Sequence, residues 1–154
     1  MTDRRLLPYR NSLAGTLLAA REAVMAPIRP FLRAAGVTEQ QWRVLRVLAD
    51  EEHIDPSRLA EAALLHAPSV TRILKELVDR ALIERRQDPV DGRRSILALT
   101  AQGKELVART AQHTLAMIDQ FDGRFGEERI ARLRAELAEF AATIKDLGDN
   151  PFGD

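Results

Sequence analysis

The sequence contains no cysteine, which excludes disulfide bonds, thiolate nucleophiles, thiol redox sensing and cysteine-based zinc sites. No apolar run approaches the roughly 20 residues that span a bilayer. The N-terminal sequence MTDRRLLPYR lacks the apolar centre of a secretory signal. We therefore expect a cytoplasmic protein with no membrane partner.

Signals for catalysis are also missing. The sequence has no glycine-rich phosphate loop and no nucleophile with an evident base partner. Its three histidines, His53, His66 and His113, form no i, i+4 pair that would suggest zinc. We expect neither enzymatic activity nor a metal or other cofactor.

The net charge is zero, because 23 Lys and Arg balance 23 Asp and Glu in a chain of 154 residues. This balance argues against a protein that coats nucleic acid by bulk attraction, although a local charged surface remains possible. The charges are in fact segregated. Arginines occupy positions 4, 5, 10, 21, 29 and 33, and the last stretch carries Glu127, Glu128, Glu136, Glu139, Asp146, Asp149 and Asp154.

Apolar spacing and capping signals predict a mainly α fold with about six helices. The first covers about 12–35, with a kink or break at Pro27 and Pro30 and an end at Gly36. The second follows Thr38-Glu39-Gln40-Gln41, in which the hydroxyl and the second glutamine can form a capping box.

Two short helices come next, over about 56–65 and 68–81, and only about three residues connect them. Asp55-Pro56 starts the first of the pair and Pro68 starts the second, as an N-cap and first-turn prolines do. Such a tight connection predicts a helix-turn-helix. Strands over 82–86 and 95–99, separated by the turn-forming residues 88–92, predict a β-hairpin that would form a wing.

A fifth helix is expected from 100 to about 122, with Thr100 as its cap and a break at 123–126. The sixth should end at 149–151. Apolar residues repeat along it at spacings of three and four, as on a helix that packs against a partner. They are Ile130, Leu133, Leu137, Phe140, Ile144 and Leu147.

The fourth helix and the hairpin carry the candidate DNA contacts. A helix N-terminus with small hydroxyls and basic residues suits the major groove, and arginine on a hairpin tip suits a narrow minor groove. We also expect Asp91 to orient a neighbouring guanidinium through a bidentate hydrogen bond. The alternatives are an ordinary solvated helix face and a salt-bridged, solubilising hairpin. The candidate residues are Pro68, Ser69, Thr71, Arg72, Lys75, Asp91, Arg93 and Arg94.

The motifs SVTRILKEL (69–77), ALIER (81–85), DGRR (91–94) and LTAQG (99–103) lie between Val37 and Leu106. This region resembles the winged helix-turn-helix domain of the multiple antibiotic resistance regulator (MarR) family. The resemblance implies a homodimer that binds a pseudo-palindromic duplex operator. It divides the chain into a DNA-binding domain at 37–103 and a dimerisation region at 1–36 and 104–154. It also implies that Asp91 and Arg93 form the wing pair, with Arg93 in the minor groove.

A narrower resemblance covers the N-terminal half. The sequences LLAAREAVM (17–25), RP (29–30) and TEQQWRVLRVLA (38–49) are similar to those of the homoprotocatechuate degradation operon repressors of that family. This implies a repressor of genes for aromatic-acid breakdown that a small aromatic acid releases from DNA. A regulator that responds to another class of ligand is the alternative.

Arg21 is the candidate contact for the effector carboxylate. At 100° per residue it falls within the apolar stripe of the first helix, and a buried arginine needs a partner. An aromatic acid could pair with it while Trp42 or Phe31 stacks on the ring, and Arg46 is a second candidate. The alternative is a salt bridge within or between subunits, for example to an acidic residue of the C-terminal helix.

A different class of function remains open. A winged-helix dimer could act as a protein-interaction module, with its wing against another chain. Such a module would show no salt-dependent operator binding.

Overall fold

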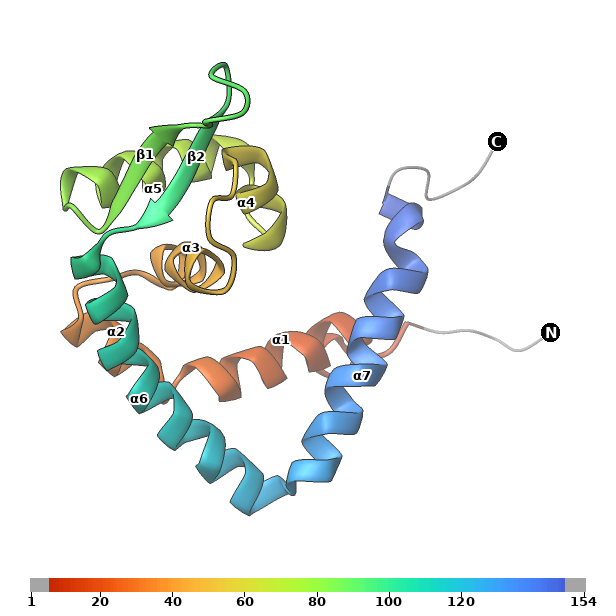
Figure 1. The fold of residues 1–154 in the computed structure, drawn as a ribbon. Helices are drawn as coiled ribbons and strands as arrows, with labels where there is room; N and C mark the ends of the chain where they lie inside the picture. Colours follow the sequence, from red (N-terminus) through yellow and green to blue (C-terminus); the bar gives the residue numbers. More distant parts are fainter. Residues whose placement is uncertain (1–5, 149–154) are drawn as a thin grey trace. The chain divides into compact units, whose positions relative to one another are not determined.

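The computed structural model describes residues 6–148, except for the side chain of Asp146. Within this range the chain forms seven α-helices, two 3-10 helices and one two-stranded sheet (Figure 1). It divides into two compact units, Met1–Thr114 and Leu115–Asp154. The arginines at 4 and 5, the acidic residues at 149 and 154 and the helix stop expected at 149–151 lie outside the described residues.

The expected first helix is broken where its prolines fall. A 3-10 helix, η1 (Tyr9–Asn11), leads into α1 (Leu13–Met25), and α2 (Arg29–Ala34) follows with a proline in its first turn. Gly36 ends α2 with φ +70, as expected for a residue just past a helix C-terminus. Gly15 is required for packing, because a Cβ there would lie 2.0 Å from the carbonyl oxygen of Tyr9.

The helix-turn-helix forms as predicted. Helix α3 (Glu39–Asp50) begins with the expected capping box between Thr38 and Gln41. Helix α4 (Pro56–Ala62) is capped by Asp55, and α5 (Ala67–Asp79) follows after a four-residue turn. Helix α4 ends three residues before the expected position because Leu64 adopts φ +54, which a continuing α-helix cannot accommodate.

Strands β1 (Ile83–Gln87) and β2 (Ser95–Leu99) pair antiparallel, with Ile83 opposite Leu99 and Gln87 opposite Ser95. The Leu97 N–H, in the middle of β2, donates to the carbonyl of Ile54 at 2.9 Å, which fixes the hairpin to the segment between α3 and α4. The hairpin packs on α3, α4 and α5, and its loop projects beyond them (Figure 1). The shared core contains the fully buried side chains of Leu45, Leu59, Leu74, Leu77 and Leu97.

Helix α6 (Ala101–Phe125) begins after Thr100, whose hydroxyl accepts from the Gly103 N–H at 3.0 Å. Of the residues 123–126, where a break was expected, only Gly126 lies outside a helix. Gly123 stays helical because glycine inside a helix costs only about 1 kcal/mol, whereas Gly126 has φ +100, a conformation suited to glycine. Helix α7 (Glu127–Ile144) and η2 (Lys145–Gly148) follow. Of the described side chains in 115–148, none is buried.

Candidate DNA-binding surface

Helix α5 has one buried face and one polar, exposed face. Val70, Ile73, Leu74 and Leu77 are buried in the core. On the opposite face, the polar residues expected to contact DNA are all at least partly exposed: Ser69, Thr71, Arg72 and Lys75, with Pro68 in the first turn. Arg72 is 67% exposed, and its Nη1 lies 3.3 Å from a carboxylate oxygen of Glu76, one turn along the helix. The face is therefore accessible to a duplex.

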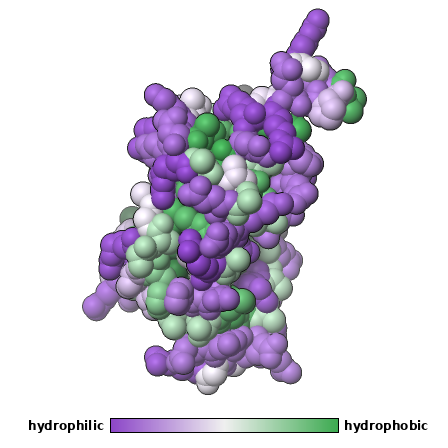
Figure 2. Space-filling view, turned by 60° about the vertical axis from the view of Figure 1, so that its left-hand side comes forward, coloured by the Kyte–Doolittle hydropathy of each residue, from purple (hydrophilic) through white to green (hydrophobic). Residues whose placement is uncertain are grey.

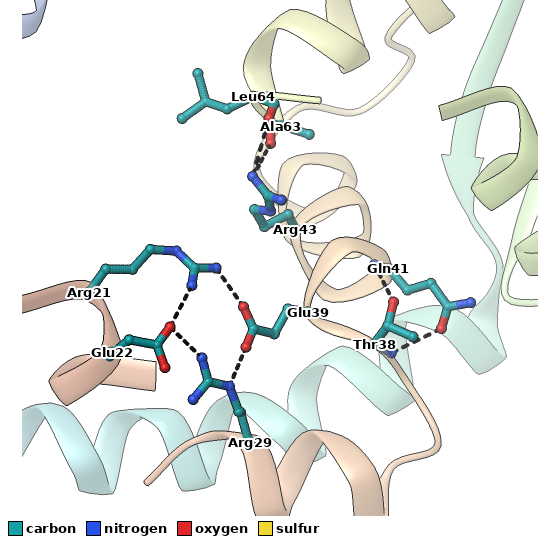
Figure 3. Close-up of polar contacts among 9 residues, drawn as sticks. All are labelled: Arg21, Glu22, Arg29, Thr38, Glu39, Gln41, Arg43, Ala63 and Leu64. Carbon is teal, nitrogen blue, oxygen red and sulfur yellow. Dashed lines mark hydrogen bonds and ion pairs between the residues drawn. The ribbon is translucent and has the colours of Figure 1, made fainter. Parts of the chain in front are cut away.

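Arg43 fixes the turn that leads into α5, a role that the sequence reasoning missed. Its Nη1 donates to the carbonyl oxygens of Ala63 and Leu64, each at 3.2 Å (Figure 3). Both carbonyls lie just after α4, in the turn, and a basic side chain at a helix C-terminus also interacts favourably with the helix dipole. The available signal was an arginine on the inward half of α3, between the buried Trp42 and Val44.

The aspartates of the hairpin loop bind backbone N–H groups. Asp88 accepts from the Val90 N–H at 2.8 Å and Asp91 from the Arg93 N–H at 3.1 Å. The Arg94 N–H donates to the Asp91 carbonyl oxygen at 2.9 Å. These bonds give the loop a defined shape, since side-chain carboxylates here replace the pairing that a tight two-residue turn would supply.

The expected bidentate contact between Asp91 and a guanidinium is not present. The shortest ion pair of Asp91 is to Arg94 Nε at 3.9 Å, beyond hydrogen-bond length, and the guanidinium of Arg93 has no ion pair among the described residues. Asp91 instead uses its carboxylate to cap the backbone of Arg93. The guanidinium of Arg93 is thus left available while its backbone is held.

Four arginines surround an open depression along the hairpin. Arg85, Arg86, Arg93 and Arg94 line it together with Gln87, Gly92 and Ser95. Arg86 is paired with Glu84 across the strand surface. Figure 2 shows the hairpin as a projection that is mostly hydrophilic and carries a small hydrophobic area. Val90 in the hairpin loop is 94% exposed. Such a cluster of guanidinium groups is suited to a phosphate backbone.

A second polar cluster joins α1 and α2 to the start of α3 (Figure 3). Glu39 accepts from Arg21 and from Arg29, and Glu22 accepts from the same two arginines. The hydrogen bond from Arg29 lowers the pKa of both Glu22 and Glu39, with Arg21 adding to the effect. The pKa of Arg29 is raised, mainly by its hydrogen bond to Glu22 and then by its hydrogen bond to Glu39. These shifts favour the charged forms of Glu22, Glu39 and Arg29.

Arg21 is not buried, contrary to its expected place in an apolar stripe. Its side chain is 48% exposed, because α1 buries only Gly15 in the described chain and leaves Leu13, Leu18 and Val24 exposed as well. Its partners are Glu22 of α1 and Glu39 of α3, so the salt bridge within the subunit that the sequence left open is present.

The other effector candidates lie on or near α3. Trp42 is 6% exposed, and Arg46, one turn along, has a loose contact of 3.7 Å with Asp50. Phe31 stacks on His113 of α6, with ring centroids 4.4 Å apart and planes at 4°. The expected aromatic contact of Phe31 is thus taken by a residue of the chain itself.

Within residues 6–148, no helix is long and apolar enough to cross a membrane, and no three His, Asp and Glu side chains converge as metal ligands.

A helix-turn-helix followed by an arginine-rich hairpin defines a DNA-binding winged-helix protein of the kind found in transcriptional regulators. The model of the MarR family matches residues 35–94. The chain is also 37% identical, over 81% of its length and 86% of the relative's, to the HTH-type transcriptional regulator FarR of Neisseria gonorrhoeae. The protein belongs to the MarR family of transcriptional regulators, and the members it matches are regulators, not enzymes.

Two further comparisons bear on the type of regulator. The homoprotocatechuate degradative operon repressor of Escherichia coli is 35% identical over 86% of this chain and 89% of its own length. The crystal structure of NadR in complex with 4-hydroxyphenylacetate superposes with a TM-score of 0.79 at 35% identity, and the match covers 90% of this chain and 98% of NadR.

Proposed function

We propose that the protein is a homodimeric repressor of an operon for aromatic-acid breakdown, and that an aromatic carboxylate releases it from its operator. The observation that carries this proposal is the 35% identity to the homoprotocatechuate degradative operon repressor over most of both chains. The similar structure of NadR holds 4-hydroxyphenylacetate, an aromatic acid. Both point to the same chemical class of effector.

The DNA contacts would come from 37–103. Phosphate contacts by the hairpin arginines would supply much of the affinity. The exposed face of α5, from Pro68 to Lys75, would read bases in the major groove, and Arg93 would enter the minor groove. Asp91 caps the backbone N–H of Arg93, and the Arg93 guanidinium has no ion pair within residues 6–148, which supports this assignment.

The dimer contacts would come from 1–36 and 104–154. Residues 115–148 have no buried side chain among those described, yet they expose a regular apolar stripe that includes Leu133, Leu137, Phe140 and Ile144. A helix with such a stripe is stable when a second apolar surface covers it. A second copy of the chain provides one, as closed two-fold symmetry is the commonest arrangement for such proteins.

The effector carboxylate is best accommodated at Arg46, with the ring against Trp42 one turn earlier on α3. The loose contact of Arg46 with Asp50 leaves its guanidinium able to take a bidentate carboxylate. Arg21 is the alternative, and it is the less favourable one because Glu22 and Glu39 already neutralise it.

Release from DNA requires that the effector binds one dimer conformation better than the other. The operator-bound conformation would hold the two α5 helices about 34 Å apart, the spacing of successive major grooves. A ligand that favours another spacing lowers operator affinity by mass action.

The test is a gel shift on the DNA upstream of the protein's own gene, repeated over a salt series and with 4-hydroxyphenylacetate. We expect sequence-selective binding that falls steeply with salt and is lost with the acid. Equal, weak binding to any duplex would favour the protein-interaction module instead. Operator binding that the acid leaves unchanged would indicate another class of ligand.

A further inference from the structure

Gln41 is one of only two polar residues buried among the described residues, with 7% of its surface exposed. It lies in the first turn of α3, and both polar atoms of its amide form hydrogen bonds. The Oε1 atom accepts from the Thr38 N–H at 3.1 Å and from Arg80 Nη1 at 3.5 Å, while Nε2 donates to Glu76 Oε2 at 2.8 Å. The bond with Thr38 belongs to the capping box. The bond with Glu76 connects α3 to α5.

Glu76 joins this buried amide to an exposed arginine. Its Oε2 atom binds Gln41, and its Oε1 atom accepts from Arg72 Nη1 at 3.3 Å. An exposed Arg–Glu pair one turn apart is ordinarily loose, because both side chains sample many rotamers. Here the carboxylate is fixed from the other side by a buried amide. The guanidinium of Arg72 therefore has a fixed partner on the surface of α5.

We propose that Gln41 and Glu76 are positioning residues for base readout, which hold the Arg72 guanidinium in place before DNA arrives. This inference rests on the proposed function, in which Arg72 contacts the operator. A side chain that is ordered in advance loses less rotamer freedom on binding. It also presents the planar, two-donor geometry that guanine recognition needs. Gln41 and Glu76 should thus contribute to operator affinity. They should not contribute to non-specific affinity, which depends on phosphate contacts.

The substitution Gln41→Glu tests this role with little disturbance of the helix. Glutamate serves as well as glutamine in a capping box, and Arg80 lies close enough to balance the new charge. The carboxylate cannot donate to Glu76, however, and repels it. The double variant Gln41→Glu/Glu76→Gln exchanges donor and acceptor and so restores the bridge. Gln40→Glu makes the same charge change one residue away and is the matched control.

Each full-length variant is titrated against the operator and against an unrelated duplex of equal length at one salt concentration, with thermal unfolding measured alongside. We expect Gln41→Glu to lower operator affinity about 3- to 10-fold and to leave non-specific affinity unchanged. The operator affinity of the double variant should return to within about twofold of the wild-type value, and that of Gln40→Glu should lie within the same range. In an Arg72→Ala background, Gln41→Glu should have no further effect, because the two residues act on one contact.

Three results would overturn the proposal: unchanged operator affinity in Gln41→Glu, an equal loss on both duplexes, or a loss that adds fully to that of Arg72→Ala. If the wild-type protein itself shows no preference for the operator, the proposed function fails before the variants are compared.

Discussion

Arg21 and Glu39 are 18 residues apart in the sequence, yet Nη2 of the arginine lies 2.5 Å from Oε2 of the glutamate. Arg29 donates to the other oxygen of the same carboxylate. One glutamate in the first turn of α3 thus binds an arginine of α1 and an arginine of α2, which joins the N-terminal helices to α3.

Glu39→Gln should therefore lower the free energy of unfolding. Two guanidinium groups would lose their shared carboxylate, and since the cluster is partly solvated we expect a loss of about 0.5–1 kcal/mol. Urea unfolding at pH 7 measures it. Glu51→Gln removes an exposed single pair with Arg58 and is the control, with an expected change below about 0.5 kcal/mol. Equal effects of the two substitutions would show that the cluster contributes no more than an ordinary surface pair.

The same cluster predicts how stability depends on pH. Glu22 and Glu39 have pKa values lowered by Arg29, so the folded state favours their charged forms. Their contribution is present above the unfolded-state pKa of roughly 4.3 and is lost as the pH falls through the lower folded-state values. The double variant Glu22→Gln/Glu39→Gln should show a weaker loss of stability between neutral and acidic pH than the wild type. An identical slope for the two proteins would contradict the ion-pair account.

The hairpin loop should respond differently to two substitutions at Asp91. Asp91→Asn keeps a side-chain oxygen that accepts from the Arg93 N–H, whereas Asp91→Ala removes it. We expect Asp91→Ala to weaken operator binding and Asp91→Asn to retain most of it. Fluorescence anisotropy with a labelled operator distinguishes them. If Asp91→Asn were as weak as Asp91→Ala, the carboxylate charge would matter instead of the backbone cap.

The effector site can be assigned by thermal shift with 4-hydroxyphenylacetate. Arg46→Ala should abolish the shift while the apo protein stays folded, and Arg21→Ala should keep the shift but lower apo stability through loss of its ion pairs with Glu22 and Glu39. The reverse pattern would assign Arg21 as the contact for the effector carboxylate. Loss of the dimer in Arg21→Ala, measured by light scattering, would indicate a role in the subunit interface.

Local signals in the sequence predicted much of the fold. The capping box at Thr38 and Gln41, the proline break before α2 and the two hairpin strands depend on nearby residues, and the structure contains all of them. The helical state of Gly123 and the exposure of Arg21 did not follow, because a helix tolerates one glycine and because a periodic stripe does not specify which surface covers it.

In the candidate site, too, local features could be predicted from the sequence and long-range contacts could not. The outward face of α5 and the position of the hairpin loop could be predicted from spacing and turn residues, whereas the capping of the Arg93 backbone by Asp91 could not. The contacts of Arg43 with the carbonyls of the turn after α4 and of Gln41 with Glu76 join residues about 20 and 35 positions apart, and no local pattern in one sequence specifies such pairs.

The most direct test of DNA recognition by α5 and the wing is the salt dependence of operator affinity in wild type, Arg72→Ala and Arg93→Ala. We predict that each substitution weakens binding by about 1–3 kcal/mol at fixed salt. The wild-type association constant should fall steeply with salt on a log–log plot. Unchanged affinity in both variants, or wild-type binding that does not depend on salt, would contradict the account.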